Sequence, residues 1–223
     1  MRLPIGAASV LGVFLLCVPA FVHARVGETQ DAIERRLLQP GVGKLYSLPI
    51  TSPSKLKDAK TVEHQQQKEE KDQPFHSFEA FLPPDIRQMI YWKSSVPNQL
   101  SNDSGWKIYV FYSGGRSVLE AYKRVGEGLN EFEINGLLNV NRGASSWKKS
   151  SGNYDTAGID YDYELEDGSV RAKSDGNWFM IFARKVDTYV VEQKRIAKAT
   201  QDRELAQQKR EQAIKAPESI SGL

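Results

Sequence analysis

Four acidic residues alternate along one short segment and are the first candidates for chemistry: Asp160, Asp162, Glu164 and Glu166. A calcium loop of the EF-hand type needs glycine where Leu165 stands and a bidentate glutamate further along. Strand alternation would instead place the four carboxylates on one face, opposite basic residues of the next strand. We therefore predict a solvated, charge-paired face at this segment and no metal site.

Other reactive residue types lack a supporting pattern. His64 and His76 lie in or beside a polar stretch, near Glu63, Glu69 and Glu70, without metal-ligand spacing. The segment "SGGR" at 113–116 lacks the Lys-Ser/Thr of a phosphate loop, and no "GxSxG" motif occurs. We expect no cofactor and no enzymatic activity. A hydrolase that uses surface carboxylates stays open, because such sites have no local motif.

The first 24 residues predict export. Arg2 precedes an apolar run, Pro19 follows it, and Val22-His23-Ala24 has the small residues that precede signal-peptide cleavage. Removal of residues 1–24 would take away Cys17, the only cysteine, and would leave no segment long enough to span a membrane. We therefore predict an exported protein, periplasmic or extracellular.

Charge gives no argument for a nucleic-acid or anionic-membrane partner. The full chain of 223 residues carries a formal net charge of +2, and loss of Arg2 with the signal peptide reduces this by one. Recognition of any partner must then depend mainly on shape.

Residues 51–84 are predicted to be a disordered polar insertion, because residues 51–74 contain almost no apolar side chains. Three segments rich in β-formers follow, at 86–93, 106–112 and 117–125. Gly114-Gly115 predicts a two-residue hairpin loop. That register pairs Val110 with Leu119 and Ile108 with Ala121 on one face, and leaves on the other face Tyr109, Phe111, Val118 and Tyr122.

Two Asp-Gly pairs, at 167–168 and 175–176, predict two further hairpins. Across the first, Tyr163 pairs with Ala172 and Glu164 with Arg171. Across the second, Ala172 pairs with Phe179 and Val170 with Ile181. The apolar face predicted from this register consists of Tyr163, Leu165, Val170, Ala172, Phe179 and Ile181.

Two similar helix starts precede these strand groups. Thr29 is predicted to cap one helix, with Ala32, Ile33, Leu37 and Leu38 facing inward before Pro40. Asn130 is predicted to cap the other, with Glu133 at the capping-box position and with Ile134, Leu137 and Leu138 facing inward, while Trp147 beyond it is an anchor into the core.

The predicted fold class is α+β: two α-β-β-β units with antiparallel meander sheets and a long C-terminal helix. The expected segments are a signal peptide (1–24), a first helix and start of unit one (25–50), the insertion (51–84), the strands of unit one (85–126), unit two (127–186), a solvated helix (187–216) and a frayed tail (217–223). A thin apolar stripe on the C-terminal helix comprises Val191, Ile196, Ala199 and Leu205.

The pattern at Gly27, Thr29, Ile33, Leu37 and Pro40, and more loosely at Leu129, Ile134 and Leu138, resembles that of SmpA/OmlA-type outer-membrane assembly lipoproteins. Tandem units of this kind also resemble the architecture of β-lactamase-inhibitor-like proteins. The sequence is similar, too, to short secreted bacterial proteins with "GET…IE…L" near the mature start. Unlike the lipoproteins, it lacks the lipid-bearing cysteine and the Gly before Pro40. The resemblance implies a helix laid across an antiparallel sheet and a place in the cell envelope.

Together these features predict an exported, non-enzymatic binding or structural protein of the cell envelope, with another envelope protein as the expected partner. An enzyme-inhibitor-like binder is an alternative. The candidate partner-binding surface is aromatic: Tyr91, Trp92, Tyr109, Phe111 and Tyr122. The alternative is that these side chains fill a second core.

Overall fold

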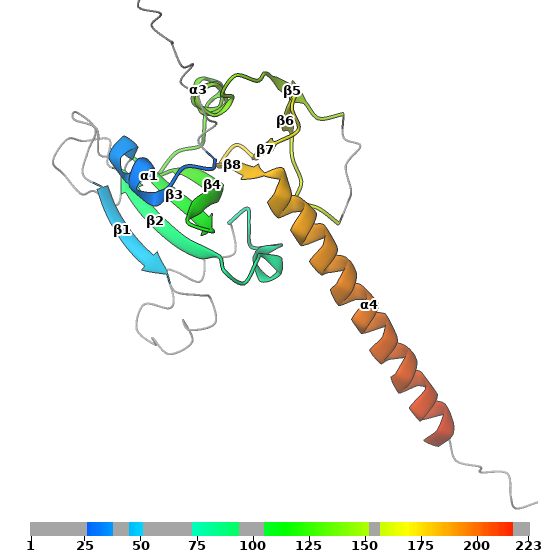
Figure 1. Cartoon of the computed structure of the whole chain (residues 1–223). Helices are drawn as coiled ribbons and strands as arrows, with labels where there is room; N and C mark the ends of the chain where they lie inside the picture. The colour runs from blue at the N-terminus through cyan, green and yellow to red at the C-terminus, as the bar shows by residue number, and fades with distance from the viewer. Residues whose placement is uncertain (1–25, 38–44, 51–72, 94–104, 152–156, 216–223) are drawn as a thin grey trace, which may run out of the picture.

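A computed structural model describes residues 26–37, 45–50, 73–93, 105–151 and 157–215. The described residues form one eight-stranded antiparallel sheet in the order β1-β2-β3-β4-β8-β7-β6-β5, with helices on both faces (Figure 1). The signal-peptide prediction, Cys17, His64 and the tail at 217–223 lie outside these residues.

Unit one begins with α1 (Gln30–Leu37) and continues through β1 (Leu45–Ile50), β2 (Arg87–Lys93), β3 (Trp106–Ser113) and β4 (Arg116–Arg124). A short 3-10 helix, η2 (Glu79–Phe81), precedes β2.

Unit two begins with α3 (Glu131–Asn141) and continues through β5 (Trp147–Lys149), β6 (Tyr163–Leu165), β7 (Val170–Ser174) and β8 (Trp178–Ala183). The long helix α4 (Arg184–Lys215) follows β8 directly.

The predicted α+β class and the long C-terminal helix are confirmed. Each unit has four strands where three were expected, because β1 precedes the insertion of unit one and the short β5 follows α3. The last strands of the two units, β4 and β8, pair antiparallel, with Ala121 opposite Met180. The two meanders therefore share one continuous sheet.

Both predicted helix caps are confirmed. The Asn130 side chain accepts a hydrogen bond from the amide of Glu133 at 2.9 Å, and the Glu133 carboxylate accepts one from the amide of Asn130 at 3.2 Å. The Thr29 hydroxyl accepts a longer bond from the amide of Ala32, at 3.3 Å. The Asn130 cap satisfies an amide that the helix itself leaves unbonded, whereas the Ala32 amide also donates to the Thr29 carbonyl at 3.1 Å.

The predicted register of the β3–β4 hairpin is wrong by one residue. Gly114 and Gly115 form the two-residue loop, with Ser113 opposite Arg116, but a β-bulge follows and pairs Phe111 with Leu119. The side-chain period of a strand is two, so a slip of one residue moves every later side chain to the other face. In β4, Tyr122 therefore lies opposite Ile108.

The predicted register of the β7–β8 hairpin is wrong by two residues. The turn spans four residues, because Asp175 Oδ1 accepts bonds from the amides of Asn177 (2.9 Å) and Trp178 (2.7 Å). Ala172 then pairs with Ile181. An even slip leaves the faces unchanged. The predicted apolar face of unit two is therefore confirmed in one core cluster, with Tyr163 packed against it.

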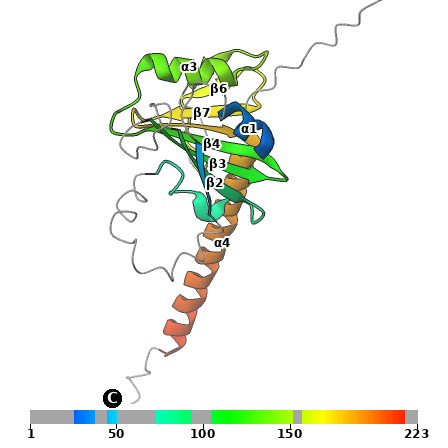
Figure 2. The same cartoon turned by 90° about the vertical axis from the view of Figure 1, so that its left-hand side faces the viewer.

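Two cores lie on opposite faces of the sheet (Figure 2). The first lies beneath α1 and α3, where the predicted inward residues Ile33, Leu37 and Leu138 are buried. The second lies on the face that η2 and the first turns of α4 cover, and Val186 and Val190 are its helical members. Each face of the sheet is thus covered by helical segments.

Part of the predicted disordered insertion is ordered. Residues 73–84 lie against the second core, with Phe75 fully buried and Phe78 only 2% exposed. Two aromatic side chains bury enough apolar area to order a short polar stretch. His76 lies in the same stretch and is exposed.

Helix α4 begins at Arg184, three residues earlier than predicted, and its 32 residues span about 48 Å. The side chains from Arg195 to Gln212 are exposed, as expected of a solvated helix, and α4 extends away from the sheet (Figure 1). Ile196 and Leu205 of the predicted stripe face solvent, at 49% and 47% exposure. None of the described helices is both long and apolar enough to cross a bilayer.

Candidate binding site

The five predicted partner-binding aromatics do not share a surface. Tyr91, Tyr109, Phe111 and Tyr122 are each 4% exposed or less, and Trp92 is partly buried. Tyr91 and Tyr122 belong to the first core, whereas Tyr109, Phe111 and Trp92 belong to or pack against the second. The one-residue register error in β4 is the reason that sequence reasoning placed Tyr122 with Tyr109. These aromatic side chains instead lie in or against the two cores, which is the alternative stated for them above.

The row of alternating acids is charge-paired as predicted. Lys173 Nζ lies 2.8 Å from Asp160 and 3.0 Å from Asp162, and Arg171 Nε lies 2.9 Å from Glu164. Within the described residues, no group of three or more His, Cys, Asp or Glu side chains could hold a metal ion.

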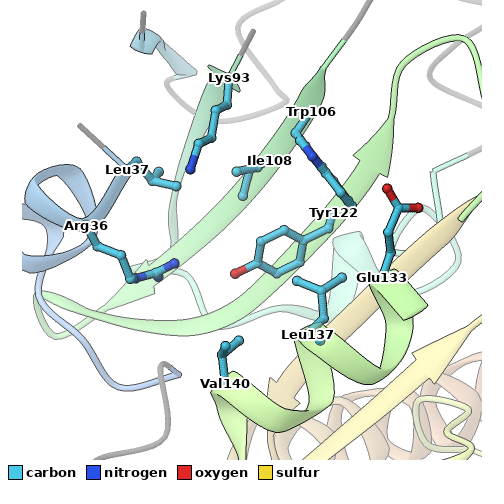
Figure 3. Close-up of a pocket in the computed structure, with 10 residues that line it drawn as sticks. Arg36, Leu37, Lys93, Trp106, Ile108, Tyr122, Glu133, Leu137 and Val140 are labelled. Atoms are coloured by element: carbon cyan, nitrogen blue, oxygen red, sulfur yellow. The ribbon is translucent and has the colours of Figure 1, made fainter. Parts of the chain in front are cut away.

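A groove between α1 and α3 is the candidate site that the structure adds. Its cavity is about 450 Å³ in volume and opens over β3 and β4, on the face of the sheet that the two helices share (Figure 3). The described residues that line it are Arg36, Leu37, Lys93, Trp106, Ile108, Tyr122, Glu133, Gly136, Leu137 and Val140. Small-molecule sites occupy cavities of about 300–1,000 Å³. The groove is therefore large enough for a small organic ligand.

Secondary structure determines which side chains reach the groove. Trp106 and Ile108 are two residues apart in β3 and so point to the same face. Glu133, Gly136 and Val140 recur at helical spacing along α3 and form one wall. Lys93, the last residue of β2, extends toward Leu37 and Ile108 (Figure 3).

A buried carboxylate lies behind the groove. Glu120 of β4 is fully buried, and the Tyr122 hydroxyl donates a hydrogen bond to its Oε2. Arg36 Nη2 lies 3.5 Å from the same oxygen and 2.9 Å from Glu28 Oε2. Glu120 Oε1 has no hydrogen-bond partner in the described part of the chain. The guanidinium thus joins two carboxylates and borders the ligand cavity.

The surroundings of Arg36 hold it in the charged form. Burial would lower its pKa, but the neighbouring Tyr122, Glu120 and Glu28 outweigh burial and raise the pKa above its ordinary value. Arg36 is therefore a fixed positive charge at the α1 end of the groove, and Tyr122 points its hydroxyl toward it (Figure 3).

Two tyrosine hydroxyls extend this polar cluster under α1. The hydroxyls of Tyr91 and Tyr112 lie 3.2 Å apart, and Tyr91 also donates to Glu34 at 3.1 Å. Burial is the main cause that raises the pKa of Tyr91 to about 12, and burial followed by the bond to Tyr91 raises the pKa of Tyr112 as well. Both phenols therefore stay neutral in the fold.

The α3 wall of the groove is held by charge pairs. Glu133 lies 3.4 Å from Arg124, whose guanidinium lies 5.3 Å from the centre of the Trp106 ring. The same carboxylate closes the capping box with Asn130. Glu133 is thus engaged by its own fold, and it positions the helix more than it offers charge to a ligand.

The groove has the features of a binding site. Its described lining combines aromatic and aliphatic side chains with Arg36 and Lys93 and includes no histidine, cysteine, serine or threonine. Sequence reasoning did not identify it. The available signal was the pair of capped helices, because two helices that cover one sheet leave a seam between them.

Comparisons with protein-family models, with curated proteins and with solved structures found no match.

Proposed function

We propose that this chain is an exported, non-enzymatic binding protein of the cell envelope. Its ligand is a small amphipathic molecule with an apolar, ring-containing body and one anionic group, held between α1 and α3. The observation that carries the proposal is the groove itself, a cavity of about 450 Å³ at the seam of the two units.

The floor of the groove favours an apolar body. Trp106, Ile108 and Tyr122 present their side chains to the cavity from two adjacent strands, and Leu137 and Val140 face them from α3 (Figure 3). Rings and branched aliphatic chains pack well against such surfaces, and their burial supplies most of the binding free energy.

The charges of the lining favour an anionic group on that body. Arg36 and Lys93 both border the cavity, and the one lining carboxylate, Glu133, is engaged by Arg124. The two cations border the same cavity, so we expect the ligand's anion within reach of the Lys93 ammonium group. A charge-assisted hydrogen bond there would orient the ligand.

Two dyes that differ by one charged group test this proposal. N-phenyl-1-naphthylamine is neutral, and 8-anilino-1-naphthalenesulfonate carries a sulfonate on the same ring system. We expect both to bind the folded protein at one site. Lys93→Met should weaken binding of the sulfonate roughly ten-fold and leave the neutral dye within about two-fold, because about 1.4 kcal/mol corresponds to ten-fold.

Lys149→Met is the matched control, because Lys149 is an exposed lysine of β5 that does not line the groove. It should leave both dye affinities unchanged. Equal weakening of both dyes by Lys93→Met, or binding of neither dye to the native protein, would contradict the proposal.

The export part of the proposal depends on the N-terminal sequence. Mass spectrometry of the protein from its native envelope or medium should give a chain that begins at Arg25. An intact N-terminus in the cytoplasmic fraction would contradict it.

A further inference from the structure

Four side chains form a row across strands β2, β3, β4 and β8. At its centre, Lys107 of β3 lies directly opposite Lys123 of β4. On one side of this pair, Trp92 of β2 is opposite Lys107. On the other side, Trp178 of β8 is opposite Lys123. Tyr109, two residues after Lys107, belongs to the second core, so the row lies on that face of the sheet, across from the groove.

The two lysines at the centre of the row are an unfavourable pair by themselves. Like charges at directly opposite positions destabilise a sheet, because their Cβ atoms are only about 5 Å apart. Each ammonium group also lies over a tryptophan ring. Lys107 Nζ is 4.7 Å from the centre of the Trp92 ring, and Lys123 Nζ is 5.2 Å from that of Trp178. Cation–π attraction thus holds two positive charges in place side by side without neutralising them.

The row combines an apolar base with access to solvent. Trp178 is a member of the second core and is only 3% exposed, whereas Lys107 and Lys123 are half-buried. Partial burial strengthens the interaction of an ammonium group with an anion, because less water screens it. Lys123 has no carboxylate of the described residues within ion-pair distance. The pair is therefore a positive site that an anion from solution can reach.

We propose that Lys107 and Lys123 together bind a dianionic phosphate group, carried by a soluble phosphate ester or by a lipid headgroup. A phosphate dianion matches both charges, whereas a carboxylate would neutralise one. Each lysine offers a compact charge with three hydrogen-bond donors to the phosphate oxygens. An anion between the two ammonium groups replaces their repulsion by two attractions, so its binding should stabilise the fold.

Thermal melts followed by circular dichroism test this site, at about pH 8 in about 20 mM inorganic phosphate and in sodium chloride of equal ionic strength. The wild type should melt about 3 °C higher in phosphate than in chloride. Lys107→Met and Lys123→Met should each lose most of that rise, because one ammonium group cannot neutralise the dianion. Lys123→Arg should retain the rise, because it keeps the charge and can stack on the ring.

The double variant Lys148→Met/Lys149→Met is the matched control for Lys107→Met/Lys123→Met. It removes two exposed lysines of β5 and changes the net charge by the same amount. It should keep the wild-type rise in phosphate. Phosphate also stabilises proteins without a specific site. An equal rise in the two double variants would therefore overturn the proposal, as would a wild type that melts at the same temperature in phosphate and in chloride.

Vesicles distinguish the two sources of the phosphate group. Cosedimentation with phosphatidylcholine vesicles that contain about 20% phosphatidate, lost in Lys107→Met/Lys123→Met and kept in Lys148→Met/Lys149→Met, would assign the site to a lipid headgroup. A thermal shift without cosedimentation would assign it to a soluble phosphate ester. The dye titrations of the groove are made in chloride and concern the other face of the sheet, so failure of the phosphate site leaves their outcome unchanged.

Discussion

The two helices that cover the shared face of the sheet lie on interiors of opposite character. Beneath α1 the sheet presents polar groups, namely the Glu120 carboxylate and the hydroxyls of Tyr91, Tyr112 and Tyr122. Beneath α3 it presents aliphatic and aromatic carbon, namely Leu165, Val170, Ala172, Phe179 and Ile181. Asn141, the last residue of α3, and Trp147, the first residue of β5, donate hydrogen bonds to the carbonyls of Leu137 and Leu138 in that helix.

This difference separates stability from specificity. An apolar interface contributes directly to folding through burial and close packing. A buried ion pair such as Arg36–Glu120 contributes little on balance, because desolvation of the charges offsets their attraction. The interior beneath α3 (the apolar half) therefore contributes most to the stability of the fold. The interior beneath α1 (the polar half) holds charges beside the groove and lowers the stability somewhat.

The largest expected effect is in the apolar half. Phe179→Ala should lower the free energy of unfolding by about 3–5 kcal/mol, because Phe179 is fully buried and its loss leaves a cavity. Urea denaturation followed by circular dichroism measures this. Phe132→Ala is the control and should change stability by about 0.5 kcal/mol or less, because that side chain is 87% exposed. A loss under 1 kcal/mol at Phe179 would show that α3 does not anchor the fold.

Replacing one member of the Arg36–Glu120 ion pair should lower the free energy of unfolding more than replacing both members. Arg36→Met should lower stability by about 3 kcal/mol, because the Glu120 carboxylate is left buried without a cation beside it. The double variant Arg36→Met/Glu120→Met should recover at least half of that loss, because no unpaired charge then remains. Additive losses in the two single variants would contradict this view of the ion pair.

Alkaline pH should destabilise the polar half specifically. Tyr91 has a pKa of about 12 in the fold against 10.0 for an ordinary tyrosine, and the pKa of Tyr112 is raised as well. A raised pKa means that the unfolded chain loses the proton first. The stability contributed by these phenols is thus complete below pH 10 and falls as the pH rises from about 10 to about 12, by about 2 kcal/mol for Tyr91 alone.

Urea midpoints measured between pH 9 and pH 12 should therefore decline less steeply for Tyr91→Phe than for the wild type. Parallel curves for the two proteins would contradict the burial of an ionisable phenol at this position.

The smallest expected effects concern the two helix starts. Asn130→Ala should cost about 1 kcal/mol, because it removes one side of a reciprocal capping box. Thr29→Ala should cost about 0.5 kcal/mol, because the bond that it removes is longer, at 3.3 Å. Thermal melts of the two variants show which one loses more stability. A larger loss in Thr29→Ala than in Asn130→Ala would contradict this prediction.

The fold could be predicted from sequence where the signal is local. Caps at Thr29 and Asn130 and the paired acids of β6 depend on residues close together in the chain, and these predictions are confirmed. Of the three predicted hairpin registers, the one at Asp167-Gly168 is confirmed, with Tyr163 opposite Ala172 and Glu164 opposite Arg171. The other two were wrong for a common reason, since a bulge and a four-residue Asx turn are alternatives that Gly-Gly and Asp-Gly pairs do not distinguish. Only the odd slip changed which side chains share a face.

The candidate site could not be predicted, because its parts come from distant segments. Arg36 and Tyr122 are separated by most of unit one, and Val140 comes from the next unit. They meet only because β4 pairs with β8 and sets the two helices side by side over one sheet. No short sequence motif predicts that β4 pairs with β8.

The most direct test of the binding groove is to fill it. Val140→Trp places a large ring at the groove wall, whereas Asn139→Trp adds the same ring at the neighbouring exposed position, which does not line the groove. Titration of N-phenyl-1-naphthylamine at about 2 μM protein should show one site in the wild type and in Asn139→Trp, and at least ten-fold weaker binding in Val140→Trp. Equal affinity in all three proteins would contradict a ligand site between α1 and α3.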